Sequence, residues 1–317
     1  MANVNTVLGP LDTSKLGFTL AHEHILPTSA GIQQVYPELI DREGTIRDGV
    51  AELRQAHREG VRTLVDVTTF DAGRDVRLLE EVSRASAVNI ICCTGIWMDV
   101  PRAFWGATPD TIASLYVREI EESIEGTGIK AGIIKASTDK GGITPVGEIT
   151  LRAAARAQRK TGVPITTHTL ASERVGEQQV RIFQEEGVDL DRVYIGHSND
   201  TTDMDYLTGL LRHGVWLGLD RMPGGRTEGT PDWHGRTEIV KRLIDAGFAD
   251  RIMLSHDASV NMTYYGVQAM DGGERHNPDG FLFTTRHVLP MLREMGVPEE
   301  TITQIMVNNP RRFFEGR

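Results

Sequence analysis

The strongest constraint on the fold is an alternation of short apolar runs with longer amphipathic segments along the whole chain. Eight of the short runs have the length and the valine and isoleucine content of buried strands. They are FTLAHEH (18–24), RTLVDVTT (62–69), VNIICCTG (88–95), AGIIKAS (131–137), VPITTHT (163–169), VYIGHS (193–198), VWLGLD (215–220) and IMLSHD (252–257). Strands that alternate with helices form parallel βαβ units, and eight units close a barrel. The sequence therefore predicts an α/β fold, a single (β/α)₈ TIM barrel domain over residues 1–317.

The segments between the runs have helical spacing. Residues 147–162, 176–187 and 235–247 are examples, and each ends at a glycine suited to a helix C-cap. The tail predicts the last barrel helix and then a C-terminal extra helix after VPEE. A doubly wound sheet is the structural alternative, but it usually has fewer strands and a glycine fingerprint after the first one, which is missing here.

Three connections are predicted to shape one end of the barrel. Two are long: residues 28–41 after the first strand and 258–280 after the eighth. A third, GGRTEGTPDWHG (224–235), suggests a mobile lid of glycines around Trp233. Long loops at one end of a barrel usually determine substrate selectivity.

The net charge restricts the binding partners, and the first residues and the cysteines indicate where the protein works. A formal net charge of −10 and a pI near 5.5 argue against nucleic acid or an anionic membrane surface as a partner. The first residues lack a signal peptide pattern and no run is long enough to span a membrane, so we expect a cytoplasmic protein. The two cysteines, Cys92 and Cys93, are neighbours in a predicted strand and need no oxidising compartment.

Titratable residues gather at the C-terminal ends of the predicted strands, where enzymes of this fold carry out catalysis. They are His22, His24, Lys135, His168, His197 and Asp257. The spacing of His22 and His24 suits a strand, in which alternate side chains share one face. Imidazole and carboxylate ligands suit Zn²⁺, Mn²⁺, Fe²⁺ or Co²⁺, so the pattern predicts a metal centre.

The other histidines receive structural interpretations. They are His57, His213, His234, His256, His276 and His287, in helices, loops or an off-face strand position. His256 adjoins Asp257 and should point away from the barrel lumen.

Lys135 is the unexpected member of the set, because an ammonium group would be repelled by metals and is costly to bury. It could snorkel to solvent or pair with Asp257. A third interpretation is that its amine has reacted with CO₂ to give a carbamate, which can bridge two metals.

With these residues in place, the chain resembles the phosphotriesterase family of the amidohydrolase superfamily. The resemblance runs from TVLGPLDTSKLGFTLAHEH to NPRRFF. Its most specific stretches are TLAHEH, VDVTTFDAGRDV, GTGIKAGIIK, GVPITTHT, DRVYIGHSND, GLDR and LSHD.

The resemblance implies two divalent metal ions per chain, zinc first, with cobalt, manganese or iron as alternatives. His22 and His24 would hold the buried metal together with Asp257. His168 and His197 would hold the more exposed one, and carboxylated Lys135 and a hydroxide would bridge the pair. Mononuclear deaminase-like relatives lack the lysine of the fourth strand.

The implied reaction is hydrolysis of a small-molecule ester by the metal-bridging hydroxide, without a protein nucleophile. The expected activity is that of an aryldialkylphosphatase on organophosphate triesters, with lactonase activity beside it. Asp257 would take the proton of the hydroxide as the new bond forms. The alternative is a lactonase of acyl-homoserine or γ- and δ-lactones with incidental phosphotriesterase activity.

The residues of the implied substrate pocket resemble the phosphotriesterases proper in one feature and the lactonase-like members in another. Family likeness places Trp97, Met98, Ala72, Pro27, Met262 and Tyr265 around the substrate. Trp97 is like the phosphotriesterases proper. Arg221 stands where those enzymes have a histidine that relays protons from Asp257 to a second aspartate, here Asp200. An arginine cannot accept a proton at working pH, so ion pairing to Asp257 and Asp200 is expected, as in the lactonase-like members.

Two other function classes would share the barrel and part of this ligand pattern. A non-catalytic barrel that binds a small molecule would show metal binding without turnover, and a deaminase or amide hydrolase of the superfamily would hold one metal per chain. Relatives tend to be dimers, and Trp105 and Tyr116, read as exposed aromatics, would fit a homodimer interface. A pocket wall or ordinary packing would account for them equally well.

Overall fold

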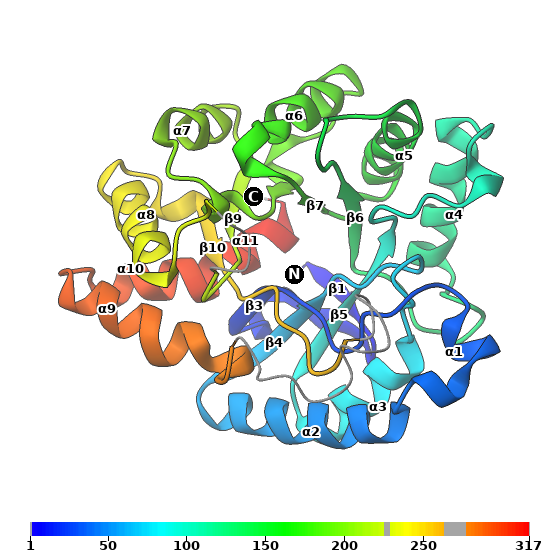
Figure 1. Cartoon of the computed structure of the whole chain (residues 1–317), viewed down its shortest axis with the longest axis horizontal. Coiled ribbons are helices and arrows are strands. Elements are labelled where there is room, and N and C mark those ends of the chain that lie inside the picture. Colours follow the sequence, from blue (N-terminus) through cyan, green and yellow to red (C-terminus); the bar gives the residue numbers. More distant parts are fainter. Residues whose placement is uncertain (1, 225–228, 263–276, 317) are drawn as a thin grey trace.

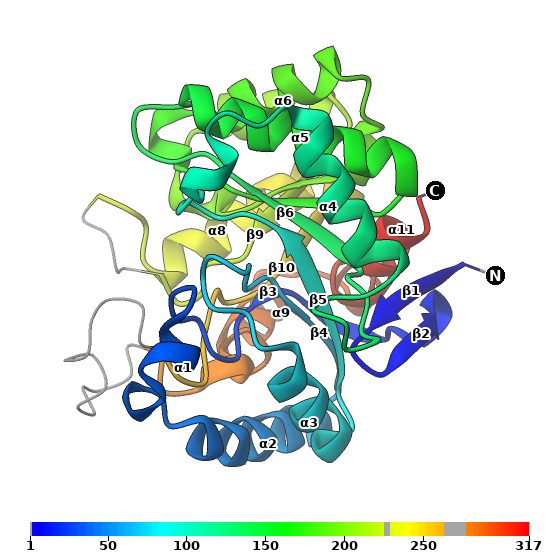
Figure 2. The same ribbon diagram turned by 90° about the vertical axis from the view of Figure 1, so that its right-hand side faces the viewer.

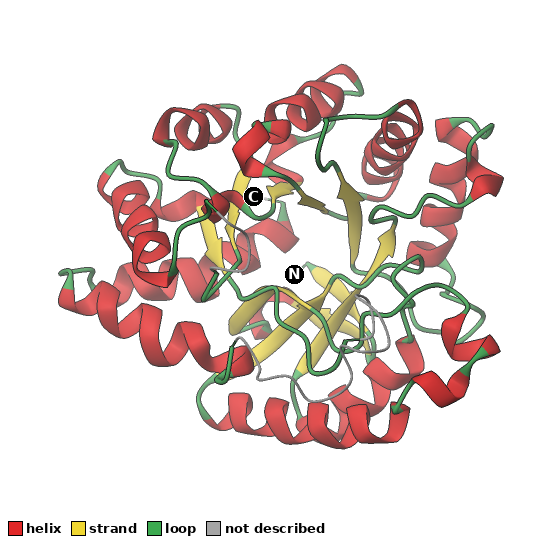
Figure 3. Cartoon of the chain, in the orientation of Figure 1, coloured by secondary structure: helices red, strands yellow, loops and turns green. Residues whose placement is uncertain are grey.

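The computed structural model describes residues 2–224, 229–262 and 277–316, and it forms the predicted (β/α)₈ barrel. Eight parallel strands follow one another around the sheet in chain order, ringed by helices (Figures 1 and 3). The strands are β3 (Phe18–Glu23), β4 (Val61–Asp66), β5 (Asn89–Gly95), β6 (Ile133–Ser137), β7 (Ile165–His168), β8 (Val193–Ile195), β9 (Trp216–Leu219) and β10 (Ile252–Leu254). All eight lie within the apolar runs or begin one residue before them, so the predicted strand order is confirmed.

The connecting helices follow the predicted pattern. They are α2 (Arg42–Arg58), α3 (Val76–Ser86), α4 (Pro109–Glu121), α5 (Pro145–Thr161), α6 (Val175–Glu185), α7 (Met204–Arg212) and α8 (Trp233–Asp245). After β10 come the last barrel helix, a π-helical turn (Thr284–Val288) with α9 (Leu289–Glu294), and the terminal α10 (Glu299–Thr303) and α11 (Asn309–Glu315). Thr144 begins α5 by accepting the Gly147 N–H, and Gly162 ends it in a left-handed conformation.

Two small elements were not expected from the sequence. An antiparallel hairpin, β1 (Asn3–Thr6) and β2 (Gly9–Asp12), precedes the barrel, and a short helix α1 (Ile32–Val35) lies in the loop after β3. Figure 2 shows the hairpin and both chain ends at the end of the barrel opposite to α1. The hairpin side is therefore the closed bottom, and the βα loops form the mouth.

Alternate strand residues divide the core into two parts. Residues such as Leu64, Cys92 and Ile252 pack between the strands and the helices. Their neighbours Val65, Cys93 and Met253 belong to a second cluster that fills the barrel interior. In that cluster the ring of Phe313 from α11 lies 6.1 Å from the rings of both Tyr194 and Trp216, so α11 seals the bottom.

The barrel closes between β10 and β3 without a regular ladder. The His24 N–H donates to the carbonyl of Ala258 at 2.9 Å, and the Asp257 N–H donates to the carbonyl of His22 at 3.2 Å. The Glu23 carboxylate, fully buried, completes this seam by accepting from the Ser255 hydroxyl at 2.7 Å and the Ala258 N–H at 2.9 Å. The seam therefore joins the first and last strands through the backbone of three predicted metal ligands, His22, His24 and Asp257.

The expectation that Tyr116 is exposed is wrong. Tyr116 is buried within α4, at 4% exposure, so it cannot form part of a dimer interface, whereas Trp105 is 55% exposed. Of the predicted lid over 224–235, residues 225–228 lie outside the described residues; Trp233 is the first residue of α8, and its ring packs edge-on to Phe283 at 5.8 Å. Among the residues described, no helix combines the length and apolar character needed to cross a bilayer.

Candidate metal centre

A β-bulge in β3 aims the two histidines of LAHEHI into the barrel. Leu20 pairs with Leu64 and Glu23 pairs with Asp66, so β3 has one more residue than β4 between these pairs. In a regular strand, His22 and His24 would point away from the barrel interior that Ala21 faces. The extra residue breaks this inside–outside alternation: Ala21 belongs to the interior cluster, and His22 and His24 also point inward and line the pocket. Glu23 then points outward to the seam, where it accepts from His256 Nδ1 at 2.6 Å, and His256 points away from the lumen as predicted.

The ligand atoms predicted for the buried metal converge. His22, His24 and Asp257 each offer one atom, and these atoms all lie within 4.8 Å of one another. Asp257 Oδ1 is 3.3 Å from His24 Nε2 and 3.7 Å from His22 Nε2. Lys135 Nζ lies 3.1 Å from His22 Nε2, so the lysine reaches the same point from β6.

His168 and His197 stand beside this group. The two rings are 4.7 Å apart in a T-shaped arrangement, and the His197 ring is 4.8 Å from that of His22. Asp139, just after β6, lies 3.3 Å from His168 Nε2, which turns His168 Nδ1 into the nitrogen available for a metal. All six predicted ligands are therefore brought to one end of the barrel.

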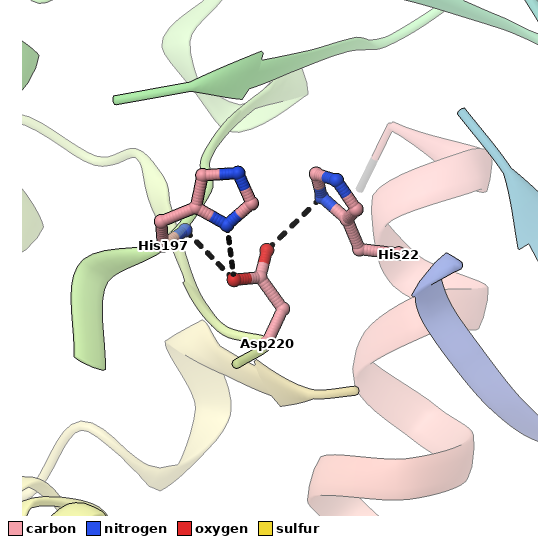
Figure 4. A group of neighbouring side chains, drawn as sticks. All are labelled: His22, His197 and Asp220. Carbon is pink, nitrogen blue, oxygen red and sulfur yellow. Dashed lines mark hydrogen bonds and ion pairs between the residues drawn. The ribbon is translucent and has the colours of Figure 1, made fainter. Parts of the chain in front are cut away.

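Partners on the far side of each imidazole fix the ring orientations. Asp220, at the end of the seventh apolar run, lies between two of them (Figure 4). Its Oδ2 is 3.0 Å from His22 Nδ1 and its Oδ1 is 3.0 Å from His197 Nδ1. The Thr68 hydroxyl lies 2.8 Å from His24 Nδ1. These contacts hold Nδ1–H and direct Nε2 to the centre, as outer groups do in metal sites.

Asp220 could itself be taken for a ligand, because it forms a close group with His22 and His197. Its oxygens are already occupied, however: the His197 N–H donates to Oδ1 at 2.7 Å and the Tyr194 hydroxyl donates to Oδ2 at 2.9 Å. Asp220 is fully buried, and its two oxygens lie against the Nδ1 atoms of two histidines.

Burial and neighbouring charges set protonation states that suit metal binding. Burial lowers the pKa of His22, His168 and His197, which favours the neutral imidazole that binds metals. Burial acts to raise the pKa of Asp257, but His197, His24 and Arg221 outweigh it and hold that pKa well below its usual range. The donor set thus fits divalent metal ions.

Burial also lowers the pKa of Lys135, to about 8, although Asp257 and Asp220 oppose the shift. Lys135 is 2% exposed, so its amine cannot snorkel to solvent. A buried amine with this pKa is partly neutral at neutral pH.

Arg221 connects Asp257 to a second acid, as the sequence predicted. Its Nε donates to Asp257 Oδ2 at 3.0 Å and its Nη1 to Asp200 Oδ2 at 2.5 Å. Arg236 lies on the other side of Asp200, with Nη1 2.7 Å from Oδ1. Asp200 is therefore held between two guanidinium groups, and its place outside the pocket lining makes it a support for Arg221.

The pocket over this centre is lined by apolar and polar residues from several βα loops. Its lining is His22, His24, Pro27, Val67, Thr69, Ala72, Trp97, Lys135, His168, Arg221, Asp257 and Met262. Four of the six residues predicted around the substrate are in this lining. Met98 is not and is 42% exposed, and Tyr265 lies outside the described residues.

Two of the predicted ligands have an unusual backbone. His197 and Asp257 lie two or three residues beyond the ends of β8 and β10, with φ values of 58° and 53° in the left-handed region. Residues other than glycine seldom adopt this conformation and are found in it preferentially at functional sites.

Sequence reasoning missed Asp220 and Asp139. Asp220 ends an apolar run just as the predicted ligands do, and that position was the available signal. Asp139 follows a strand by two residues in a polar loop, where no pattern distinguishes it.

Comparison with known proteins agrees with this arrangement. The profile of the phosphotriesterase family matches residues 2–314. A phosphotriesterase homology protein of Mycobacterium tuberculosis is 40% identical over 99% of this chain and 98% of its own length. An aryldialkylphosphatase of Saccharolobus solfataricus is 37% identical over 96% of each chain, and the human N-acetyltaurine hydrolase is 25% identical over 98% and 97%. The resemblance of the motifs is confirmed, and the chain belongs to the phosphotriesterase family.

Proposed function

We propose that this protein is a binuclear-metal hydrolase of uncharged phosphotriesters, with lactone hydrolysis as a second activity. The observation that carries the proposal is the convergence of His22, His24, Lys135 and Asp257, with His168 and His197 beside them, at the mouth of the barrel. When bound, a metal pair supplies a hydroxide near neutral pH and a Lewis acid for the P=O or C=O oxygen.

Lys135 would become the bridging ligand by reaction with CO₂. Its neutral amine nitrogen would form a bond to the carbon of CO₂, the nitrogen would lose one proton, and a carbamate anion would result. The lowered pKa of about 8 makes the neutral amine available for this step. The carbamate would also convert a buried cation, which repels metals, into a carboxylate analogue.

Asp257 is the residue placed to move a proton. It is held ionised beside the histidines, so it can accept a proton from the attacking oxygen nucleophile and later donate it to a leaving alkoxide. Arg221 fixes Asp257 Oδ2 and leaves Oδ1 directed at the centre.

The charged residues of the described pocket lining are already engaged, which supports an uncharged substrate. In the described lining, Arg221 is already paired with two carboxylates and Lys135 belongs to the metal centre, so neither is placed to bind an anionic substrate group. Pro27, Ala72, Trp97 and Met262 offer apolar surface instead. A neutral triester or lactone fits this surface better than a phosphate monoester.

A second candidate, a protein that is primarily a lactonase, is favoured by Arg221. Because Arg221 cannot relay a proton onward from Asp257, the proton stays at the centre, where an opened lactone needs it. An aryl phosphotriester needs no such proton, since its phenolate departs unaided.

The test is metal analysis of the purified protein together with hydrolysis of an aryl dialkyl phosphate and of acyl-homoserine, γ- and δ-lactones. Two metals per chain with turnover of the phosphotriester support the proposal. Faster lactone turnover selects the second candidate. Full metal loading with no turnover of any of these esters would refute both.

A further inference from the structure

The Asp71 carboxylate joins three loops at the mouth of the barrel. It lies in the loop after β4 and is 3% exposed. Its Oδ1 accepts the Trp97 N–H, and its Oδ2 accepts the N–H groups of Met98 and Asp99, each at 3.1 Å. A single buried side chain therefore holds three consecutive backbone amides of the loop after β5.

The backbone beside Asp71 is bonded to the loop after β3. The Asp71 carbonyl accepts the Ala30 N–H at 3.0 Å, and the Ala72 carbonyl accepts the Thr28 N–H at 2.8 Å. Gly73 has a φ of 74°, and a Cβ there would lie 1.8 Å from the Thr28 hydroxyl oxygen, so this approach of the two loops requires glycine.

Each of these three loops supplies an apolar residue to the pocket close to the Asp71 bonds. They are Pro27, Ala72 and Trp97, and all three lie within one residue of a bond made by Asp71 or its neighbour. The Trp97 ring stands edge-on to His168, with centroids 5.7 Å apart. A shift of the Trp97 loop would therefore change the distance between the apolar wall and the metal centre.

The described hydrogen bonds of the Asp71 carboxylate go to the three amides of residues 97–99, and Thr69 of the same loop adds a favourable side-chain interaction. Arg74, the nearest cation in the same loop, is bound to Glu119 through both terminal nitrogens. A buried carboxylate is retained only where hydrogen bonds replace its hydration, and here backbone amides provide them.

We propose that Asp71 is a positioning residue that sets substrate selectivity by fixing the Trp97 wall of the pocket relative to the metal centre. The inference rests on the proposed function for its choice of substrates. Asp71 does not contact the substrate or the metal ligands. It acts through the backbone of residues 97–99.

The main variant is Asp71→Asn, which keeps the size of the side chain but replaces one acceptor oxygen by an NH₂ group. In either amide orientation an N–H donor then faces another donor. The control is Asp75→Asn in the same loop. Asp75 also accepts a backbone N–H, that of Leu78 at 2.9 Å, where it caps α3, and its other oxygen accepts from Arg42 Nε at 2.9 Å. The described hydrogen bonds of its side chain do not reach residues 97–99.

The first measurement is hydrogen–deuterium exchange of the metal-loaded protein. In Asp71→Asn the amides of residues 97–99 are expected to exchange at least about tenfold faster, since one acceptor for three amides is lost. In Asp75→Asn these amides keep the wild-type rate. Unchanged exchange in Asp71→Asn would overturn the proposal. If Asp71→Asn does not fold, Asp71→Glu, which moves the charge by about 1.5 Å, is measured in its place.

The second measurement compares dimethyl and dibutyl 4-nitrophenyl phosphate as substrates, with metal content determined on the same samples. We expect the ratio of the two kcat/KM values to change by roughly tenfold in Asp71→Asn, mainly through KM, with two metals per chain retained. An equal loss on both substrates would mean a general structural role and would overturn the selectivity claim.

Binding of tributyl phosphate, measured by calorimetry, separates this inference from the proposed function. If the wild-type protein hydrolyses neither ester, the proposed function fails, but a weaker affinity for tributyl phosphate in Asp71→Asn than in Asp75→Asn would still support the positioning role. Equal affinities in the two variants would overturn it.

Discussion

Replacing Asp220 by asparagine should loosen both halves of the metal centre at once. One Asp220 oxygen faces His22 Nδ1, a predicted ligand of the buried metal, and the other faces His197 Nδ1, a predicted ligand of the exposed metal, each at 3.0 Å. An asparagine has the same shape but only one acceptor oxygen. Its NH₂ group would face one of the two Nδ1–H groups, and that histidine would have to change tautomer, which puts its proton on Nε2 and blocks metal binding. The other histidine would keep an acceptor, but a neutral amide oxygen holds its Nδ1–H less strongly than a carboxylate does, so its metal site is weakened too.

The size of the effect follows from the burial of this residue. Asp220 is fully buried, so water cannot replace the lost acceptor. Loss of an outer hydrogen bond of this kind weakens metal affinity by about 10- to 100-fold. That range corresponds to about 1.4–2.7 kcal/mol of binding free energy.

The assay is equilibrium competition with a chelator, with bound metal counted per chain. The matched control is Thr68→Val, which removes the partner of His24 Nδ1 and so should weaken only the buried metal. We expect two weakened sites in Asp220→Asn and one in Thr68→Val. Wild-type affinity at both sites in a folded Asp220→Asn protein would refute the argument that Asp220 fixes the histidine tautomers.

Four further predictions concern three residues of the centre, Lys135, Asp257 and Arg221. Lys135→Ala should lose one metal and most activity, with partial rescue by propionate. In wild-type protein the carbamate signal in ¹³C NMR should grow as pH rises through about 8, because the neutral amine reacts; no pH dependence would contradict this. Asp257→Asn should reduce lactone turnover by about 10²–10⁴-fold, and wild-type kcat would exclude its proton-transfer role. Arg221→Gln should move the acidic limb of the pH–rate profile upward, since Arg221 helps to hold the pKa of Asp257 down; an unmoved limb would assign that limb to another group.

The barrel could be read from the sequence because its signal is repeated eight times. Each apolar run is short, and no single one distinguishes a strand from a buried helix, but the order of runs and helical segments leaves few topologies. The hairpin β1–β2 carried no such signal: its eight residues contain only Val4 and Leu11 as large apolar side chains, and it packs at the bottom through contacts distant in sequence.

The clustering of the six predicted ligands could be read from the sequence for the same reason, since each occupies an equivalent position near a strand end. The sequence could not show how deeply each side chain is buried. Tyr116 and Trp105 are both aromatic residues near polar neighbours, and only the packing of α4 against the barrel buries one and leaves the other exposed. The role of Asp220 likewise depends on where two Nδ1 atoms meet, which requires three strands to be placed together.

The left-handed backbone at His197 and Asp257 bears on how such a chain can evolve. A side chain in this region costs on the order of 1 kcal/mol that glycine would not incur. A descendant that gave up catalysis could therefore gain folding stability by substituting these positions, with His197→Gly as the simplest route. Thermal stability alone would favour glycine at both positions, so the proposed metal centre is the reason to keep an imidazole and a carboxylate there.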